Sequence, residues 1–198
     1  MERPTKEQIR ELPLYTGLDL VNIKIIENEV DAENVLKVLE NQVCLGFDTE
    51  SKPTFRKGEM TAGPTLIQLA TASKAYLFPT RFPAAVSAAM KILTDPSIKK
   101  VGFGIKGDSK ELRTKFNINI SNTLDLSVKL KKITGEKNTI GAKCAVAMVL
   151  KLRLAKRAQT SNWGAYPLNK SQILYAANDA HCAICTEIAL KELNSIHS

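Results

Sequence analysis

Two acids at the end of an apolar run are the first candidates for chemistry in this chain. The segment GFDTE places Asp48 and Glu50 at positions i and i+2, and alternate residues of a strand share one face. Two carboxylates held close repel each other unless a proton or a cation lies between them, so a divalent cation would stabilise them. The same triplet at Asp31 and Glu33 begins a predicted helix, where acids suit the macrodipole. A cation at Asp48 and Glu50 is therefore indicated by their position at the end of a buried strand, and not by the triplet itself.

A further acid, Asp108, follows the apolar run KKVGFG and the tight turn GIKG. Taken alone, this position favours an N-cap for a helix over residues 109–116. A metal contact remains open beside it, because a carboxylate has two oxygens and one can cap while the other meets a cation.

Tyr175 and Asp179 are the third feature, four residues apart in a segment predicted to be a long helix. Residues at i and i+4 lie on one helix face. That helix is apolar on more than one side, so it is expected to be buried. An Asp inside it is costly to desolvate and needs either a Lys or Arg partner or a bound cation.

The elements that must position these residues follow from hydrophobic periodicity and turn residues. Apolar runs rich in strand formers alternate with amphipathic segments, which favours an α/β fold with a mixed sheet flanked by helices. The chain is predicted to be a lead segment (1–20) followed by one domain (21–198). Strands are predicted at 21–27, 43–50, 65–71, 75–80 and 99–104, the middle three forming a meander, and helices at 31–41, 83–93, 108–116, 140–154 and 171–193, with helical chain from 124 onward.

Bulk properties bound the function. A formal charge of +8 over 198 residues favours a polyanionic partner or simply solubility. No stretch approaches the ~18 apolar residues of a membrane span, and the polar N-terminus leads us to expect a cytoplasmic protein.

The four cysteines are expected to be reduced, and His181, Cys182 and Cys185 are interpreted as core packing, since a second cysteine pair for zinc is lacking.

The order of these features resembles the DEDD exonucleases of the tyrosine subclass, which include ribonuclease D and the Werner-type exonuclease domain. The likeness runs from about residue 43 to the end of the last helix. It includes the stretches FDTESKPTF, PTLIQLAT, VGFGIKGDSKEL, SNWGAYPL and YAANDA. Ser51 is a departure, because Werner-type domains usually have Trp after the Glu. Trp163 is interpreted as a packing anchor.

The resemblance implies a ribonuclease-H-like fold and a 3′-to-5′ exonuclease that releases 5′-mononucleotides from DNA or RNA. It implies two Mg²⁺ or Mn²⁺ ions, with Asp48 bridging both, Glu50 and Asp179 completing one site and Asp108 supporting the other. Tyr175 would orient the attacking water.

Residues expected to contact substrate are mainly basic, because nucleic-acid affinity is spread over many phosphate contacts. The backbone near Thr49 and Glu50 is expected to meet the terminal 3′-OH, and Phe55 to stack on a base. The basic candidates are Lys52, Arg56, Lys57, Lys106, Lys143, Lys156 and Arg157.

Two other functions remain open at this stage. Gly102, Gly104 and Gly107 match a dinucleotide-binding fingerprint with Asp125 about twenty residues on, but no βαβ repeat follows. The second alternative is a catalytically silent nucleic-acid-binding module of the same fold, against which the complete acidic set argues.

Overall fold

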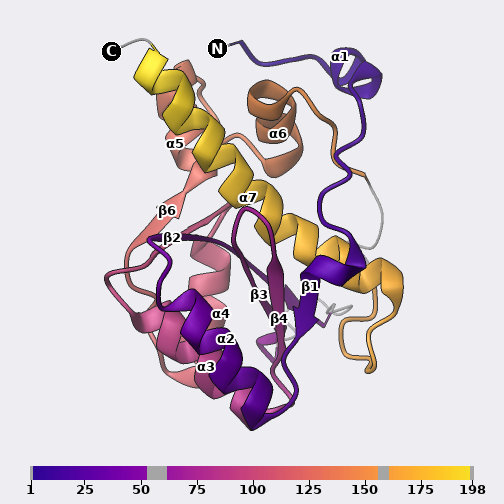
Figure 1. Cartoon of the computed structure of the whole chain (residues 1–198). Coiled ribbons are helices and arrows are strands. Elements are labelled where there is room, and N and C mark those ends of the chain that lie inside the picture. The colour runs from indigo at the N-terminus through magenta and orange to yellow at the C-terminus, as the bar shows by residue number, and fades with distance from the viewer. Residues whose placement is uncertain (1, 53–61, 156–160, 197–198) are drawn as a thin grey trace.

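A computed structural model describes residues 2–52, 62–155 and 161–196 as a three-layer α/β/α structure (Figure 1). Within these residues a six-stranded mixed sheet runs in the order β1-β4-β3-β2-β5-β6. The strands are β1 Ile23–Ile25, β2 Cys44–Ser51, β3 Pro64–Ala70, β4 Ala75–Pro79, β5 Lys99–Gly102 and β6 Thr123–Asp125.

The predicted meander is confirmed, because β2 pairs antiparallel with β3 and β3 pairs antiparallel with β4. Strand β1 lies parallel to β4, and β2, β5 and β6 are parallel neighbours. The strand predicted at 21–27 is shorter, since a 3-10 turn occupies Leu20–Asn22. The helical chain predicted from residue 124 onward is wrong at its first two residues, which belong to β6. A strand of three residues is too short for its sequence to show the period of two that predicts a strand.

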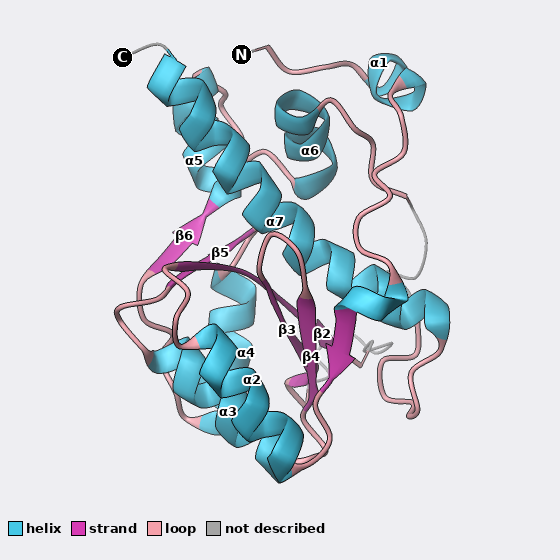
Figure 2. Ribbon diagram, viewed as in Figure 1, coloured by secondary structure: helices cyan, strands magenta, loops and turns pink. Residues whose placement is uncertain are grey.

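Helices cover both faces of the sheet (Figure 2). The long helix α7 packs on one face with α5 and α6, while α2, α3 and α4 cover the other. Strand residues alternate accordingly, so that Leu66 joins the core under α7 and Ile67 joins the core on the opposite side. The helices are α2 Glu29–Leu39, α3 Pro83–Thr94, α4 Lys106–Phe116, α5 Leu126–Thr134, α6 Ala142–Leu150 and α7 Lys170–Ile196.

Helix ends account for three corrections. Asn28 caps α2 by accepting from the Asp31 backbone N–H at 2.9 Å, so the helix begins at Glu29 and the start predicted at residue 31 is wrong. Helix α4 begins at Lys106, which places Asp108 inside its first turn and not at its N-cap. Helix α6 ends at Leu150 because Lys151 adopts a left-handed conformation with φ 57°, so the helix predicted to residue 154 is too long.

The lead segment packs against the domain. It contains the short helix α1 Lys6–Glu11, whose N-terminus carries a capping box built on Thr5. Leu14 then forms a β-bridge with Arg153, and Leu18 is buried in the core under α7. The lead segment, from residue 2 onward, is therefore held to the domain by backbone pairing and apolar burial.

The histidine and cysteine cluster on α7 has local hydrogen-bond partners. His181 Nε2 donates to the Ala72 carbonyl at 3.0 Å, which leaves Nδ1 to accept from the Tyr15 hydroxyl at 2.6 Å. The Cys182 thiol donates to the Asp179 carbonyl at 3.2 Å. These partners agree with packing of the cluster in the core, and the four cysteines are free thiols.

Among the described helices, none combines the length and the hydropathy needed to span a membrane.

Candidate active site

The candidate site begins with the close approach of β2 to α7. Asp48 and Glu50 share a strand face with Gly46, and this face points toward α7. A Cβ on Gly46 would lie 1.9 Å from the Ala180 carbonyl oxygen, so only glycine lets the two backbones meet there. This contact brings the end of β2 against the helical turn that carries Asp179.

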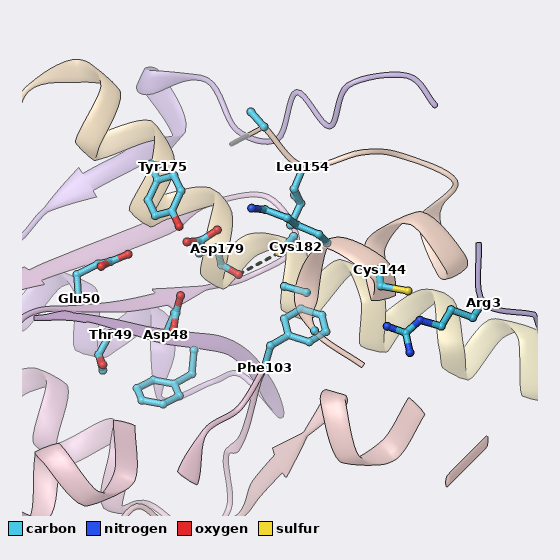
Figure 3. Close-up of a pocket in the computed structure, with 15 residues that line it drawn as sticks. Arg3, Asp48, Thr49, Glu50, Phe103, Cys144, Leu154, Tyr175, Asp179 and Cys182 are labelled. Carbon is cyan, nitrogen blue, oxygen red and sulfur yellow. Dashed lines mark hydrogen bonds between the residues drawn. The ribbon is translucent and has the colours of Figure 1, made fainter. Parts of the chain in front are cut away.

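Three carboxylates meet at this contact. Asp48, Glu50 and Asp179 each offer an oxygen within 4.8 Å of the others. Figure 3 shows the Tyr175 hydroxyl directed toward the same group from one turn earlier on α7. The i, i+2 spacing on the strand and the i, i+4 spacing on the helix thus converge on one point.

Burial raises the pKa of each of these acids, and repulsion by neighbouring acids adds to the rise for Asp48 and Glu50. Burial, and then the charges of Asp179 and Asp108, raise the pKa of Glu50 to about 8. The pKa of Asp48 is raised by the same two causes. Burial also raises the pKa of Asp179 to about 6, although a hydrogen bond from Tyr175 and the charge of Lys143 offset part of this effect.

The donor chemistry of the group fits a divalent cation. Without one, burial shifts all three carboxylates toward their protonated forms, and Glu50, with its pKa raised to about 8, keeps a proton at neutral pH. All the candidate ligand atoms are carboxylate oxygens, which suit hard cations such as Mg²⁺ and Mn²⁺ better than soft metals.

Asp108 lies apart from the three clustered acids. It belongs to α4, which packs on the opposite face of the sheet, and its Oδ1 accepts a hydrogen bond from the Thr49 hydroxyl at 2.5 Å. Its charge still raises the pKa of Asp48 and Glu50. Burial raises the pKa of Asp108 to about 6, while the Thr49 hydrogen bond acts in the opposite direction.

A cavity of about 670 Å³ opens over the acids, which is the size of a small-molecule or nucleotide site. Tyr175 and the clustered acids line one end in Figure 3, Phe103 and Cys182 lie in the middle, and Cys144 lies toward the other end. Buried acids at one end of the cavity suit a cation, and a cation held there can meet a phosphate of a ligand that extends away.

A family model described as 3′-5′ exonuclease matches residues 23–193. The chain belongs to this family. The 3′-5′ exonuclease of Arabidopsis thaliana is 32% identical over 179 residues, covering 83% of this chain and 61% of that protein. The mouse bifunctional exonuclease and helicase WRN is 31% identical over 164 residues, covering 77% of this chain and 11% of that protein. The chain thus spans less than two thirds of the length of either relative.

Solved structures agree with this membership. The Nibbler EXO domain of Aedes aegypti superposes with a TM-score of 0.78 and 27% identity, covering 90% of this chain and 92% of that one. Ribonuclease D of Trypanosoma brucei, solved in complex with RNA, gives 0.77 at 18% identity, covering 93% and 64% respectively. The second likeness supports the ribonuclease-H-like fold alone.

The predicted substrate residues of this exonuclease domain are only partly in the cavity. Lys143 lines it, as does Thr49. Lys52 and Lys106 are exposed and do not line it; the aliphatic part of Lys52 lies near Gly164. Outside the described residues lie Phe55, Arg56, Lys57, Lys156 and Arg157.

Trp163 is buried and its ring centroid lies 6.0 Å from that of Tyr175, so the prediction that it is a packing anchor is confirmed.

Cys182 could have been placed in the cavity from the sequence, because it follows Asp179 by three residues on one helix. Arg3, Cys144 and Leu154 also line the cavity, and no periodicity in the sequence connects them to the acids.

The dinucleotide fingerprint in the exonuclease domain has a structural explanation. Asp125 caps α5 by accepting from the Ser127 backbone N–H at 2.9 Å and also accepts from the Gly104 N–H at 3.1 Å. Its Oδ1 therefore closes the loop after β5 and begins the next helix. This use of Asp125, together with the family membership, removes the basis for a nicotinamide site.

Proposed function

We propose that this domain hydrolyses nucleic acid from the 3′ end and releases 5′-mononucleotides, with the clustered carboxylates holding divalent cations. The observation that carries the proposal is the convergence of Asp48, Glu50 and Asp179 within 4.8 Å at one end of the 670 Å³ cavity. Membership of the 3′-5′ exonuclease family supports both the reaction and its direction.

The four acids divide between two cation positions. Asp48 with Glu50 and Asp179 would hold one ion, and Asp108 with Asp48 would hold the other. Two bound cations supply charge stabilisation for the attacking and leaving oxygens of a phosphodiester. Their positive charge would also offset the repulsion that raises the pKa values of Asp48 and Glu50.

Tyr175 acts as a hydrogen-bond donor in this proposal. Burial, and then the charges of Asp179 and Glu50, hold the pKa of Tyr175 well above that of a free phenol. The hydroxyl therefore keeps its proton at neutral pH and cannot serve as a base. Its direction toward the acidic group suits it to orient a water molecule or a phosphate oxygen for in-line attack (Figure 3).

For the substrate we propose a single-stranded 3′ end of DNA or RNA, with Mg²⁺ or Mn²⁺ as the cation. The basic composition supports a polyanionic strand. The RNA complex of the trypanosomal ribonuclease D concerns that protein, and it supports including RNA among the substrates tested here.

The test uses DNA and RNA oligonucleotides labelled at either end, incubated with Mg²⁺, Mn²⁺ or EDTA. A 5′-labelled strand should shorten as a ladder, a 3′-labelled strand should release labelled mononucleotide at once, and EDTA should stop both reactions. Cleavage of a circular single strand would contradict the exonuclease proposal. Binding of the oligonucleotides without turnover in either metal would favour the catalytically silent module.

A further inference from the structure

The far end of the cavity is built by the N-terminal lead. Arg3 lines the same cavity as Asp48 and Asp179, and Figure 3 places it at the opposite end, beside Cys144. Its side chain is 47% exposed, so the guanidinium is open to solvent and to a ligand. The lead thus contributes a cation to a cavity whose acidic end belongs to β2 and α7.

Backbone hydrogen bonds fasten the lead beside this cavity. The Arg153 N–H donates to the Pro13 carbonyl at 2.8 Å, and the Tyr15 N–H donates to the Arg153 carbonyl at 2.9 Å. Arg153 Nε adds a bond to the Leu12 carbonyl at 2.9 Å. The next residue, Leu154, itself lines the cavity. The hydrogen bonds of Arg153 therefore hold this part of the lead segment beside the cavity wall.

A second attachment joins the lead to the helix of the acidic group. The Leu18 N–H donates to Asn178 Oδ1 at 2.9 Å, one residue before Asp179. Gly17 adopts φ +63° at this point, and a Cβ there would lie 1.8 Å from the same Oδ1. Both ends of the segment from Pro13 to Leu18 are therefore anchored to elements that form the cavity.

The contacts of Arg3 leave it available for an anion. Its Nη1 lies 3.6 Å from Glu136 Oε2, with both side chains partly exposed, and such surface pairs are weak. The guanidinium also lies against the Cys144 thiol, where it offsets part of the burial that raises the pKa of that thiol. Lys143, which also lines the cavity, adds a second positive charge. A phosphate can therefore compete with Glu136 for Arg3.

We propose that Arg3 binds a phosphodiester of the substrate strand on the 5′ side of the cleaved bond. This inference rests on the proposed function, because it takes the acids as the site of the cleaved phosphate. A strand held there by its 3′ end must continue along the cavity, and the cavity continues to Arg3. The lead segment is thereby part of the substrate cleft, and Arg3 favours strands long enough to reach it.

The test compares Arg3→Ala with Arg10→Ala, a matched loss of one exposed charge from the same lead. Each is assayed on a dinucleotide and on a long single strand. In Arg3→Ala the preference for the long strand over the dinucleotide should fall roughly threefold to fivefold, while Arg10→Ala keeps the preference of the parent. Glu136→Gln removes the competing carboxylate, so its preference for the long strand should rise.

A binding measurement is independent of turnover. Fluorescence anisotropy of a labelled strand in EDTA should show weaker binding by Arg3→Ala, with a salt dependence lower by about 0.7 in the logarithmic slope, as expected for one lost phosphate contact. Equal slopes for the Arg3 and Arg10 variants would overturn the inference, as would equal losses on dinucleotide and long strand. If the parent cleaves neither substrate, the proposed function fails, while the binding comparison still tests Arg3.

Discussion

At the residue scale, the site consists of acids whose surroundings disfavour the ionised form of the carboxyl group. Asp48, Glu50 and Asp179 lie within 4.8 Å of one another, and burial raises the pKa of each. A protein tolerates such a group only if protons or cations neutralise it. The need for a neutralising proton or cation is thus already present in the geometry of three side chains.

Asp48→Ala and Asp179→Ala should each lower hydrolysis by about a thousandfold or more, because each removes a carboxylate that stabilises the catalytic charge. The melting temperature in EDTA should stay level or rise, since removing one acid relieves repulsion. Asp31→Ala is the matched control, because it belongs to the other Asp-x-Glu triplet and pairs with Lys24 on the surface. Unchanged turnover in either site variant would refute the assignment.

Tyr175→Phe should lower turnover by about a hundredfold, since it removes a positioned hydroxyl and keeps the ring packed on Trp163. The concentration of Mn²⁺ that gives half-maximal activity should stay close to that of the parent. Single-turnover cleavage across a Mn²⁺ titration measures both quantities. Cleavage at the parental rate at saturating Mn²⁺ would make Tyr175 a packing residue only.

At the element scale, the contacts of β2 with its neighbours decide where the acids stand. One face of the strand meets α7 through Gly46, and the other reaches α4 through two side-chain hydrogen bonds. The Thr49 hydroxyl donates to Asp108, and the Ser51 hydroxyl donates to Glu111 one helical turn later. The strand therefore positions acids on both sides of the sheet.

Gly46→Ala should destabilise the fold and reduce activity together, because its Cβ would lie 1.9 Å from the Ala180 carbonyl oxygen. A clash between backbones cannot be relieved by a rotamer change, so a loss of about 1 to 3 kcal/mol is expected. Gly107→Ala serves as the stability control, since Gly107 is helical and a Cβ there would have no neighbour within 4 Å. Equal melting temperatures for the parent, Gly46→Ala and Gly107→Ala would contradict the close-contact explanation.

Thr49→Val should raise the Mn²⁺ concentration needed for half-maximal activity, with much of the activity recovered at saturating metal. The Thr49 hydroxyl orients Asp108 and opposes the rise of its pKa, so without it Asp108 holds its proton to higher pH. Thr49→Ser keeps a donor and should behave as the parent does. If both variants respond to Mn²⁺ in the same way, the hydroxyl has no part in positioning Asp108.

At the scale of the whole molecule, the acidic group links stability to pH and to metal. The folded state raises the pKa of Glu50 from 4.5 to about 8, so the folded state binds this proton more tightly than the unfolded state. Its stabilising contribution is complete below the unfolded value and is lost as pH rises through the folded value.

In EDTA, the melting temperature of the parent should therefore fall relative to that of Glu50→Gln as pH rises from 4.5 to about 8. Adding Mg²⁺ should raise the melting temperature of the parent, and more so at higher pH, because the cation binds deprotonated carboxylates. Calorimetry across this pH range measures both effects. Parallel pH profiles for parent and variant in EDTA would show that Glu50 keeps an ordinary pKa in the folded state.

Short-range spacing was sufficient to predict much of this protein. The period of a strand put Asp48 and Glu50 on one face, and the period of a helix did the same for Tyr175 and Asp179, because these relations depend only on backbone geometry. The meander and the α/β class followed from hydrophobic runs for the same reason. Capping was harder to predict, since Asn28 and Asp31 are equally good caps of α2 by residue type, and only the observed hydrogen bond decides between them.

Only the tertiary structure decided which distant segments meet. Gly46 was not singled out by its sequence context, yet its missing Cβ allows β2 to touch α7 and brings Asp179 to Asp48. Asp108 stands on the opposite layer, held by Thr49, because α4 covers the other face of the sheet. Arg3 lines the cavity, and the lead segment that carries it is fastened to the domain by backbone hydrogen bonds with Arg153. These positions depend on sheet order and close packing between elements, which no local period encodes.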